Sequence, residues 1–197
     1  GDTYYNKSLA NIPELFSIGM KKSGWYKRNT IIWHKPNCMP SSAKDRFTVD
    51  FEYLFFFSKN KKYYFEQQVE PAKNISIKRY EYGLHTREDE IVYPGDRKNG
   101  FHSTIKMKNY FKDPKNRNKR TVWKIVPKSY KGAHFAVFPE KLIETPIKAG
   151  CPEDGIVLDP FIGSGTTASV AKRLSRNYVG IELNSDYLEL INKRLGD

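Results

Sequence analysis

Apolar residues recur at two different periods along this chain, and the alternation of the two periods predicts an α/β protein. Near the N-terminus, a period of about 3.6 residues predicts a helix over residues 8–22. Its true start is expected at Ile12 or Pro13, because Pro is tolerated in the first helical turn. The helix is expected to stop at Gly24.

Two runs rich in aromatic and branched residues follow and predict strands. The first covers 26–33, and the second, FEYLFFF at 51–57, predicts a buried central strand. Glu52 within the second run is unexpected for a strand core. A further short strand is expected at 63–65.

Strand and helix patterns alternate through the C-terminal part of the chain. A helix is predicted to begin near Pro139 and to end at Gly150, and Pro146 inside it should kink or shorten it. Asp186 and Glu189 form a capping pattern at the start of the last helix. The other elements expected are strands at 121–126, 156–158 and 178–181 and helices at 168–174 and 186–195.

A loop of small residues follows the strand at 156–158, and the next strand ends in an acid, Glu182. This order is the pattern of a parallel βαβ unit, in which ligands bind beyond the carboxyl ends of the strands. Gly163 and Gly165 let a ligand approach the backbone, and an acid at a strand end can accept hydrogen bonds from a ribose. The 23 positions from Asp159 to Glu182 are close to the interval of nucleoside-binding units, about 20 residues. The pattern indicates an adenosine-type cofactor site.

Three common glycine-loop patterns do not fit this loop. A dinucleotide fingerprint requires a third glycine where Ala168 stands, and a phosphate-binding P-loop requires a Lys that is absent. A nucleophile elbow requires Gly two residues before the serine, whereas Ile162 precedes Ser164 at that distance. A purely structural turn, with small residues that serve packing alone, stays open as the alternative.

The string D-P-F-x-G-S-G-T-T, which begins at Asp159, resembles the S-adenosylmethionine-binding motif of DNA amino-methyltransferases. Three more strings extend the resemblance over almost the whole chain: I-I-W-H-K-P-N-x-M-P-S-S-x-K-D-R-F from Ile31, E-Y-L-F-F-F-S-K from Glu52 and H-F-A-V-F-P-E-K-L-I from His134. The resemblance implies an α/β, Rossmann-like fold with a doubly wound, mostly parallel sheet, incomplete here and with a basic insertion. It also implies S-adenosyl-L-methionine as cofactor.

By this resemblance, the glycine loop, the acid with its neighbours and the string at His134 bind the cofactor. Taken alone, His134 is better explained as a packed or loop histidine, and its place in this string makes a cofactor contact an equal alternative. The cofactor-binding residues implied are His134, Phe135, Ala136, Asp159, Pro160, Phe161, Gly163, Ser164, Gly165, Thr166, Thr167, Glu182, Leu183 and Asn184. The segment that follows the family's catalytic loop is matched in order by Lys35, Asn37, Pro40, Ser41, Asp45, Arg46 and Glu52.

Positive charge is concentrated in one part of the chain. The net charge is +12, and the segment from Arg97 to Lys131 holds twelve Lys or Arg residues and one acid, Asp113. Such a concentration is typical of a polyanion-binding surface, and the aromatic residues among the cations suit phosphate contacts with base stacking. A solvated, Lys-rich face is the alternative.

The basic residues fall mostly within 66–120, which lacks apolar periodicity and is interrupted by Gly and Pro. We expect a long insertion here. By the resemblance it is the target-recognition region, and the partner is double-stranded DNA. We expect 1–65 to be the remainder of the catalytic half and 121–197 to be the cofactor half of the same domain.

The family's catalytic loop, [DNS]-P-P-[YW/F], is absent, since the chain has no Pro-Pro dipeptide. Methylation of an amino group requires a flipped-out base, and this loop accepts the amino hydrogens in the family. No catalytic residue is therefore expected. Methylation of cytosine carbon needs a Pro-Cys nucleophile, but Cys38 follows Asn37 and Cys151 follows Gly150. We expect a chain truncated at its N-terminus, or one whose partner subunit carries the loop.

The composition also bears on metal sites, disulfides and membrane or signal segments. The two isolated cysteines fit neither a disulfide framework nor a thiolate zinc site, and the four histidines lack ligand spacing, so no metal site is expected. No apolar run reaches the about 18 residues of a membrane span, and no signal layout is present. Cytoplasmic location in a prokaryote or phage is expected, with the oligomeric state open.

Three functions compete at this point. A DNA methyltransferase acting on the amino group of adenine or cytosine accounts for the loop, the acid and the basic insertion. A non-catalytic nucleic-acid-binding module on the same scaffold is the alternative, and the intact loop and Glu182 argue against it. Methylation of RNA or of a small molecule fits the cofactor site but leaves the basic insertion unexplained.

Overall fold

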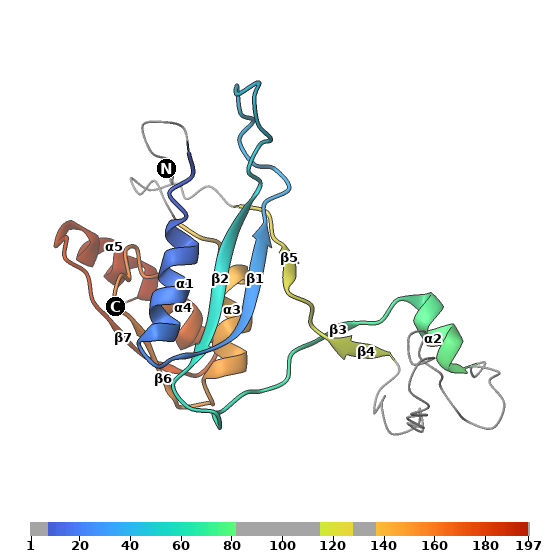
Figure 1. Cartoon of the computed structure of the whole chain (residues 1–197). Coiled ribbons are helices and arrows are strands. Elements are labelled where there is room, and N and C mark those ends of the chain that lie inside the picture. The colour runs from blue at the N-terminus through green and yellow to red at the C-terminus, as the bar shows by residue number, and fades with distance from the viewer. Residues whose placement is uncertain (1–7, 82–114, 128–136, 197) are drawn as a thin grey trace. The chain divides into compact units, whose positions relative to one another are not determined.

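The structure, a computed structural model, describes residues 8–81, 115–127 and 137–196 (Figure 1). The chain divides into two compact units: residues 1–67 with 120–197 form the first, and residues 68–119 form the second. Each unit has its own sheet structure. Among the described residues, no helix is both long and apolar enough to cross a membrane.

The first unit contains a three-stranded sheet in the order β2-β1-β5. β1 (Tyr26–His34) pairs antiparallel with β2 (Phe51–Ser58) and parallel with β5 (Val122–Lys124). The helix α1 (Ile12–Lys22) places the Phe16 ring 6.3 Å from the Phe55 ring of β2. The helix therefore packs on one face of this sheet.

The core beside β1 is built around two tryptophans. Trp33 and Trp123 lie directly opposite each other in the parallel β1–β5 pair. Both are buried, together with Ile125 and with Leu142 of α3 (Glu140–Gly150). The Trp33 Nε1–H donates a hydrogen bond of 2.8 Å to the Ile125 carbonyl. This buried bond fixes the chain that leaves β5 against the end of β1.

The C-terminal part of the first unit is a βαβα arrangement. β6 (Ile156–Asp159) and β7 (Asn177–Gly180) pair in parallel, and α4 (Thr166–Arg173) connects them. Val170 and Ala171 of α4 are fully buried against Val157 and Tyr178 of the strands and Ile147 of α3. The last helix, α5 (Asp186–Leu195), buries Ile191 against Ile162 and Ala168.

The other face of the β6–β7 pair is uncovered in the described part of the chain. Ile156 and Leu158 of β6 are 68% and 61% exposed, and Val179 and the following Ile181 are 50% and 56% exposed. Parallel sheets are ordinarily covered on both faces. The helices α3, α4 and α5 thus supply one of the two layers that such a sheet requires.

The second unit pairs two short strands. β3 (Val69–Pro71) and β4 (Asn116–Asn118) are antiparallel, and the helix α2 (Asn74–Glu81) follows β3. The Arg117 guanidinium contacts the Glu70 carboxylate at 2.9 Å across the pair. Most of the predicted basic insertion, including five of its six aromatic residues, lies outside the described residues, which end at 81 and resume at 115.

The α/β class is confirmed, and several local predictions need correction. The described strands form three small sheets with both parallel and antiparallel pairs. The strand at 51–57 is not central, because β2 is the edge of its sheet and Tyr53 is 37% exposed. Residues 63–65 form no strand. Pro146 lies within α3 without shortening it, and the cap position of α5 is Ser185 rather than Asp186.

Candidate cofactor site

The glycine loop leaves β6 at Asp159 and is tied to the chain that leaves β7. The Ile181 N–H donates to the Asp159 carbonyl at 3.0 Å, and the Ile162 N–H donates to the Ile181 carbonyl at 3.1 Å. The loop therefore sits beyond the carboxyl ends of two parallel strands. Ligands bind at this edge in open α/β sheets.

Two glycines shape the loop by adopting left-handed backbone angles. Gly163 has φ of 53°, and Gly165, at the cap position of α4, has φ of 78°. Residues with a side chain seldom adopt these angles. Directly beneath the loop, a Cβ added to Gly180 would lie 2.2 Å from the Ile162 Cδ1 atom. The loop can therefore lie close against β7 only because that position has no side chain.

Asp159 joins the start of the loop to the start of α4. One carboxylate oxygen accepts from the Phe161 N–H at 3.0 Å, and the other accepts from the Thr167 hydroxyl at 2.5 Å. A carboxylate near a helix N-terminus is also favoured by the helix dipole. These hydrogen bonds fix the orientation of Asp159 and link the start of the loop to the first turn of α4.

Glu182 follows the end of β7, and its side chain contacts the glycine loop. Its Oε2 atom accepts from the Gly163 N–H at 2.9 Å, and its Oε1 atom accepts from the Asn184 N–H at 2.9 Å. Both bonds involve an ionised acceptor and are stronger than neutral ones. The carboxylate is therefore held in one orientation, next to the glycine backbone.

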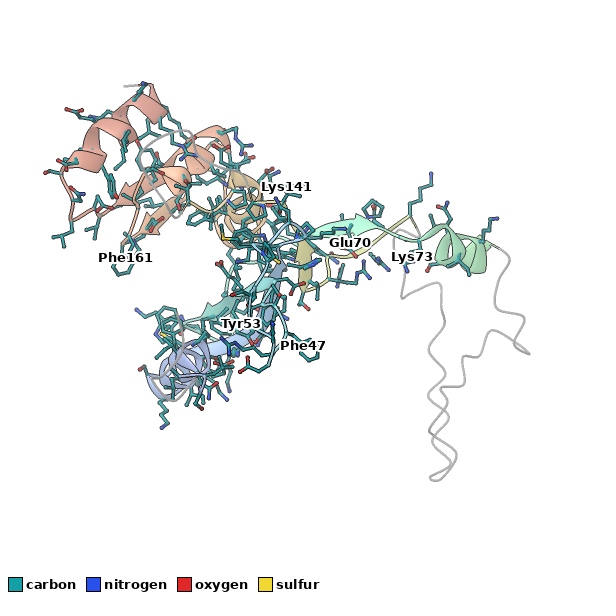
Figure 2. The ribbon with its side chains drawn as sticks, turned by 90° about the horizontal axis from the view of Figure 1, so that it is seen from above. Phe47, Tyr53, Glu70, Lys73, Lys141 and Phe161 are labelled. Carbon is teal, nitrogen blue, oxygen red and sulfur yellow. The ribbon has the colours of Figure 1, made fainter. Side chains whose placement is uncertain are left out.

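Buried hydroxyls and exposed apolar side chains divide the site into an inner and an outer part. Ser164, Thr166 and Thr167 are at most 5% exposed. Phe161 and Leu183, by contrast, are 88% and 101% exposed, and Figure 2 shows Phe161 projecting outward from the ribbon. An apolar surface beside a few fixed polar groups is the usual composition of a small-molecule site.

An arginine that the sequence did not single out supports the loop from behind. The Arg194 guanidinium of α5 donates to the Thr166 hydroxyl at 2.9 Å and approaches the Ser164 hydroxyl at 3.3 Å. Its other nitrogen contacts the Glu140 carboxylate of α3 at 3.0 Å, and its side chain is 15% exposed. No local pattern marks this role, because the contacts join residues 28 to 54 positions apart.

The structure brings together most of the residues expected to bind the cofactor. Those of the loop and of the second strand end lie at one edge: Asp159, Pro160, Phe161, Gly163, Ser164, Gly165, Thr166, Thr167, Glu182, Leu183 and Asn184. His134, Phe135 and Ala136 lie outside the described residues. No group of three His, Cys, Asp or Glu side chains suited to a metal occurs in the described ranges.

The segment matched to the region after the catalytic loop connects β1 with β2. Lys35 pairs with Glu52 at 2.7 Å, which explains the acid within the aromatic strand, since Glu52 points to solvent with a side-chain exposure of 59%. His34 lies 3.3 Å from Asp50 beside this pair. These two contacts thus join the two ends of the segment between β1 and β2.

Comparison with known proteins supplies the family context. A family model described as DNA methylase, of the N6/N4 type, matches residues 1–193. The type II methyltransferase M.SmaI of Serratia marcescens is 38% identical over 193 residues, which cover 96% of this chain and 53% of that protein. M.Cfr9I of Citrobacter freundii is 37% identical over 189 residues, with coverages of 96% and 51%. The chain spans about half the length of these curated relatives.

Solved structures show the same fold. The PvuII DNA methyltransferase, described as cytosine-N4-specific, matches with a TM-score of 0.62 and 20% identity, over 97% of this chain and 58% of that chain. A complex of M1.HpyAVI with S-adenosylmethionine matches with a TM-score of 0.59 and 24% identity, over 95% and 71%. At these identities the likeness supports the fold alone.

Proposed function

The chain belongs to the N6/N4 family of DNA methylases, and on that premise we propose that it binds S-adenosyl-L-methionine at the glycine-loop edge. We propose further that the intact protein transfers the methyl group to the exocyclic amino group of adenine or cytosine in DNA. The observation that carries the proposal is the hydrogen bond of 2.9 Å between the Gly163 N–H and Glu182. It supports the proposal because it holds the glycine loop and the acid together at one edge.

The residues at this edge suit an adenosine moiety. Glu182, oriented by two backbone donors, accepts from the ribose hydroxyls, while Gly163 lets the ligand approach the backbone. The exposed Phe161 and Leu183 offer apolar surface to the adenine ring. The bound cofactor supplies an electrophilic methyl group for transfer. By family resemblance, His134, Phe135 and Ala136 contact its methionine end.

The catalytic loop comes from outside this chain in our proposal. The 197 residues contain no Pro-Pro dipeptide, and the chain spans about half of its curated relatives. Among the described residues, one face of the β6–β7 pair is uncovered, with Ile156 68% exposed, which also fits a sheet whose second face is covered by further protein. A preceding segment or a partner subunit would supply the loop and complete the doubly wound, mostly parallel sheet.

Duplex DNA is the proposed partner, and modification beside a restriction enzyme is the proposed role. The family is one of DNA methylases, and the relatives with 38% and 37% identity are type II methyltransferases. The dense positive charge between Arg97 and Lys131 suits phosphate contacts around a recognition site. Residues 66–120 are the proposed target-recognition region.

A calorimetric titration with S-adenosyl-L-methionine tests the cofactor assignment. We expect saturable binding of one cofactor per chain, and no binding by a folded chain would support the non-catalytic module instead. A second assay measures the transfer of labelled methyl groups to DNA. The chain alone should be inactive, and transfer by the chain alone would contradict the proposal that its catalytic loop lies elsewhere.

A further inference from the structure

A cluster of positive charge lies at the end of the β1–β2 hairpin, outside the predicted basic insertion. The antiparallel register pairs Tyr26 with Ser58 and Lys27 with Phe57, so the start of β1 and the residues after β2 lie at one end. α1 ends just before β1 and adds two more lysines. We call this group of cations the basic hairpin end; its members share one end of the sheet but not one face, since Lys27 lies over Phe55 and Arg28 lies over Tyr63, which packs on Phe56. The group comprises Lys21, Lys22, Lys27, Arg28, Lys59, Lys61 and Lys62.

The charge of the basic hairpin end is not neutralised by neighbouring acids. Neither 21–28 nor 59–65 contains an Asp or Glu. Among the ion pairs of the described residues, none includes any of the seven cations. The first acid that follows 59–65 in the sequence is Glu66, and its carboxylate accepts from the Tyr64 hydroxyl at 3.3 Å.

Aromatic rings hold several of these cations in place. The Lys59 ammonium lies 6.0 Å from the centre of the Trp25 ring, and the Arg28 guanidinium lies 5.3 Å from the centre of the Tyr63 ring. Arg28 also donates to the Tyr63 hydroxyl at 2.8 Å. An aromatic face attracts a cation without cancelling its charge. Arg28 and Lys59 therefore have aromatic neighbours that leave their positive charge intact.

The helix α3 separates the basic hairpin end from the glycine loop. The Glu66 N–H, just after the cluster, donates to the Ala149 carbonyl at the C-terminal end of α3. At the other end of α3, Glu140 binds Arg194, which contacts Thr166 in the loop. α3 has 11 residues, so its rise is about 16 Å at 1.5 Å per residue. The cluster is therefore separate from the cofactor edge.

We propose that the basic hairpin end binds the phosphate backbone of duplex DNA, as a sequence-independent contact apart from the cofactor edge. The proposal rests on the proposed function, because a DNA methylase is the reason to choose DNA among polyanions. Lys and Arg contacts to phosphate supply affinity without base readout. This group of cations would hold duplex outside the recognition site and raise the rate of encounter with it.

The test compares the salt dependence of binding for two variants of equal charge. Lys61→Gln/Lys62→Gln removes two exposed cations of the cluster, and Lys141→Gln/Lys193→Gln removes two exposed cations on α3 and α5. The affinity of the full chain for a labelled duplex of arbitrary sequence is measured by fluorescence anisotropy over a salt series. For the first variant, the negative slope of log K against log salt should become shallower by about 1.8, because each lost phosphate contact removes about 0.9.

The control variant should keep the wild-type slope within error. Equal loss in the two variants, or no binding of duplex by the wild-type chain, would overturn the proposal, as would tighter binding of single-stranded RNA of the same length. Cofactor titration of the same proteins separates this inference from the proposed function. If the wild-type chain does not bind the cofactor, the proposed function is refuted. A shallower salt slope for Lys61→Gln/Lys62→Gln would still establish the phosphate contact.

Discussion

The backbone N–H of Gly163 and the carboxylate of Glu182 are joined by a hydrogen bond of 2.9 Å, although 19 positions separate the two residues. The bond connects the loop after β6 to the end of β7. A side chain that binds a ribose must be held still, because ordering it during binding costs affinity. The glycine thus orients the acid, and the acid in turn holds the glycine loop.

Replacement of the acid should weaken cofactor binding without unfolding the protein. Glu182→Gln keeps the size of the side chain but replaces a charged acceptor with a neutral amide that has one acceptor oxygen. We expect the affinity for S-adenosyl-L-methionine to fall by about 10- to 100-fold, the range for a lost charged hydrogen bond. Calorimetry measures it. Glu189→Gln, at an exposed position of α5, is the matched control and should bind as the wild type does.

A methyl group at Gly180 should destabilise the fold. Its Cβ would lie 2.2 Å from Ile162 Cδ1 and 3.1 Å from Ile162 Cβ, so the Ile162 side chain has to move and its backbone has to give slightly. Gly180→Ala should therefore cost about 1–3 kcal/mol, as overpacking does. Thermal unfolding measures the loss. Gly19→Ala is the contrasting control, since that Cβ meets open space within α1 and should stabilise by about 1 kcal/mol.

A second substitution checks the cause of that loss. Ile162→Val removes the Cδ1 atom, so the double variant Gly180→Ala/Ile162→Val should recover part of the stability that Gly180→Ala loses. Additive losses in the double variant would show that the close contact with Ile162 is not responsible.

Loss of the supporting arginine should affect both stability and the cofactor. Arg194→Met removes the contacts with Glu140 and Thr166, and we expect the free energy of unfolding in urea to fall by about 1.5–3 kcal/mol. Cofactor affinity should fall as well, because the loop loses its support. Arg194→Lys should restore only part, since an ammonium cannot reproduce the planar fork. Lys193→Met, at the neighbouring exposed position, should stay within about 0.5 kcal/mol of wild type.

Acidification should remove the stabilisation that the Glu144–Lys148 ion pair gives to α3. The hydrogen bond from Lys148 lowers the pKa of Glu144 below its ordinary value of 4.5, and the nearby Arg173 adds to the effect. A carboxyl whose pKa is lower in the folded state stabilises the protein above its unfolded pKa and loses this contribution as the pH falls through the folded value. The stability difference between wild type and Glu144→Gln should therefore shrink on acidification below 4.5.

Denaturant unfolding at neutral and acidic pH measures this difference. Lys148→Met removes the other partner and should reduce the pH dependence in the same range. A difference between wild type and Glu144→Gln that is constant across the range would contradict the role of the pair.

Local patterns predicted four of the five described helices, but they missed α2, which lies in the segment expected to be an insertion without apolar periodicity. The helical period and Pro13 located α1, whose observed start is Ile12, and the glycine loop placed α4 and the parallel pair around it. The aromatic run of β2 suggested burial, but burial depends on which strands lie beside it. The rings of β2 instead pack along the sheet surface, as Tyr53 and Phe55 do at 5.6 Å.

Long-range contacts account for the other differences. The aromatics at Tyr63 and Phe65 suggested a strand, yet their rings pack against Phe56, each at 5.6 Å, without joining a ladder. The support from Arg194 depends on Glu140, 54 positions away, and no periodic pattern reports such a contact. The proximity of the glycine loop and its acid could be predicted from local sequence because both belong to one βαβ unit.

The two parallel strand pairs differ in the length of chain that must close before each can form. Gly163 and Glu182 are 19 positions apart, whereas the bond between Trp33 and Ile125 joins residues 92 positions apart. Closing a longer segment costs more entropy, and local contacts form faster than distant ones. The amides of β6 and β7 should therefore gain hydrogen-exchange protection early in refolding, before those of β1 and β5 around Trp33 and Trp123. The glycine loop with β6 and β7 would fold first, and the β2-β1-β5 sheet would form afterwards.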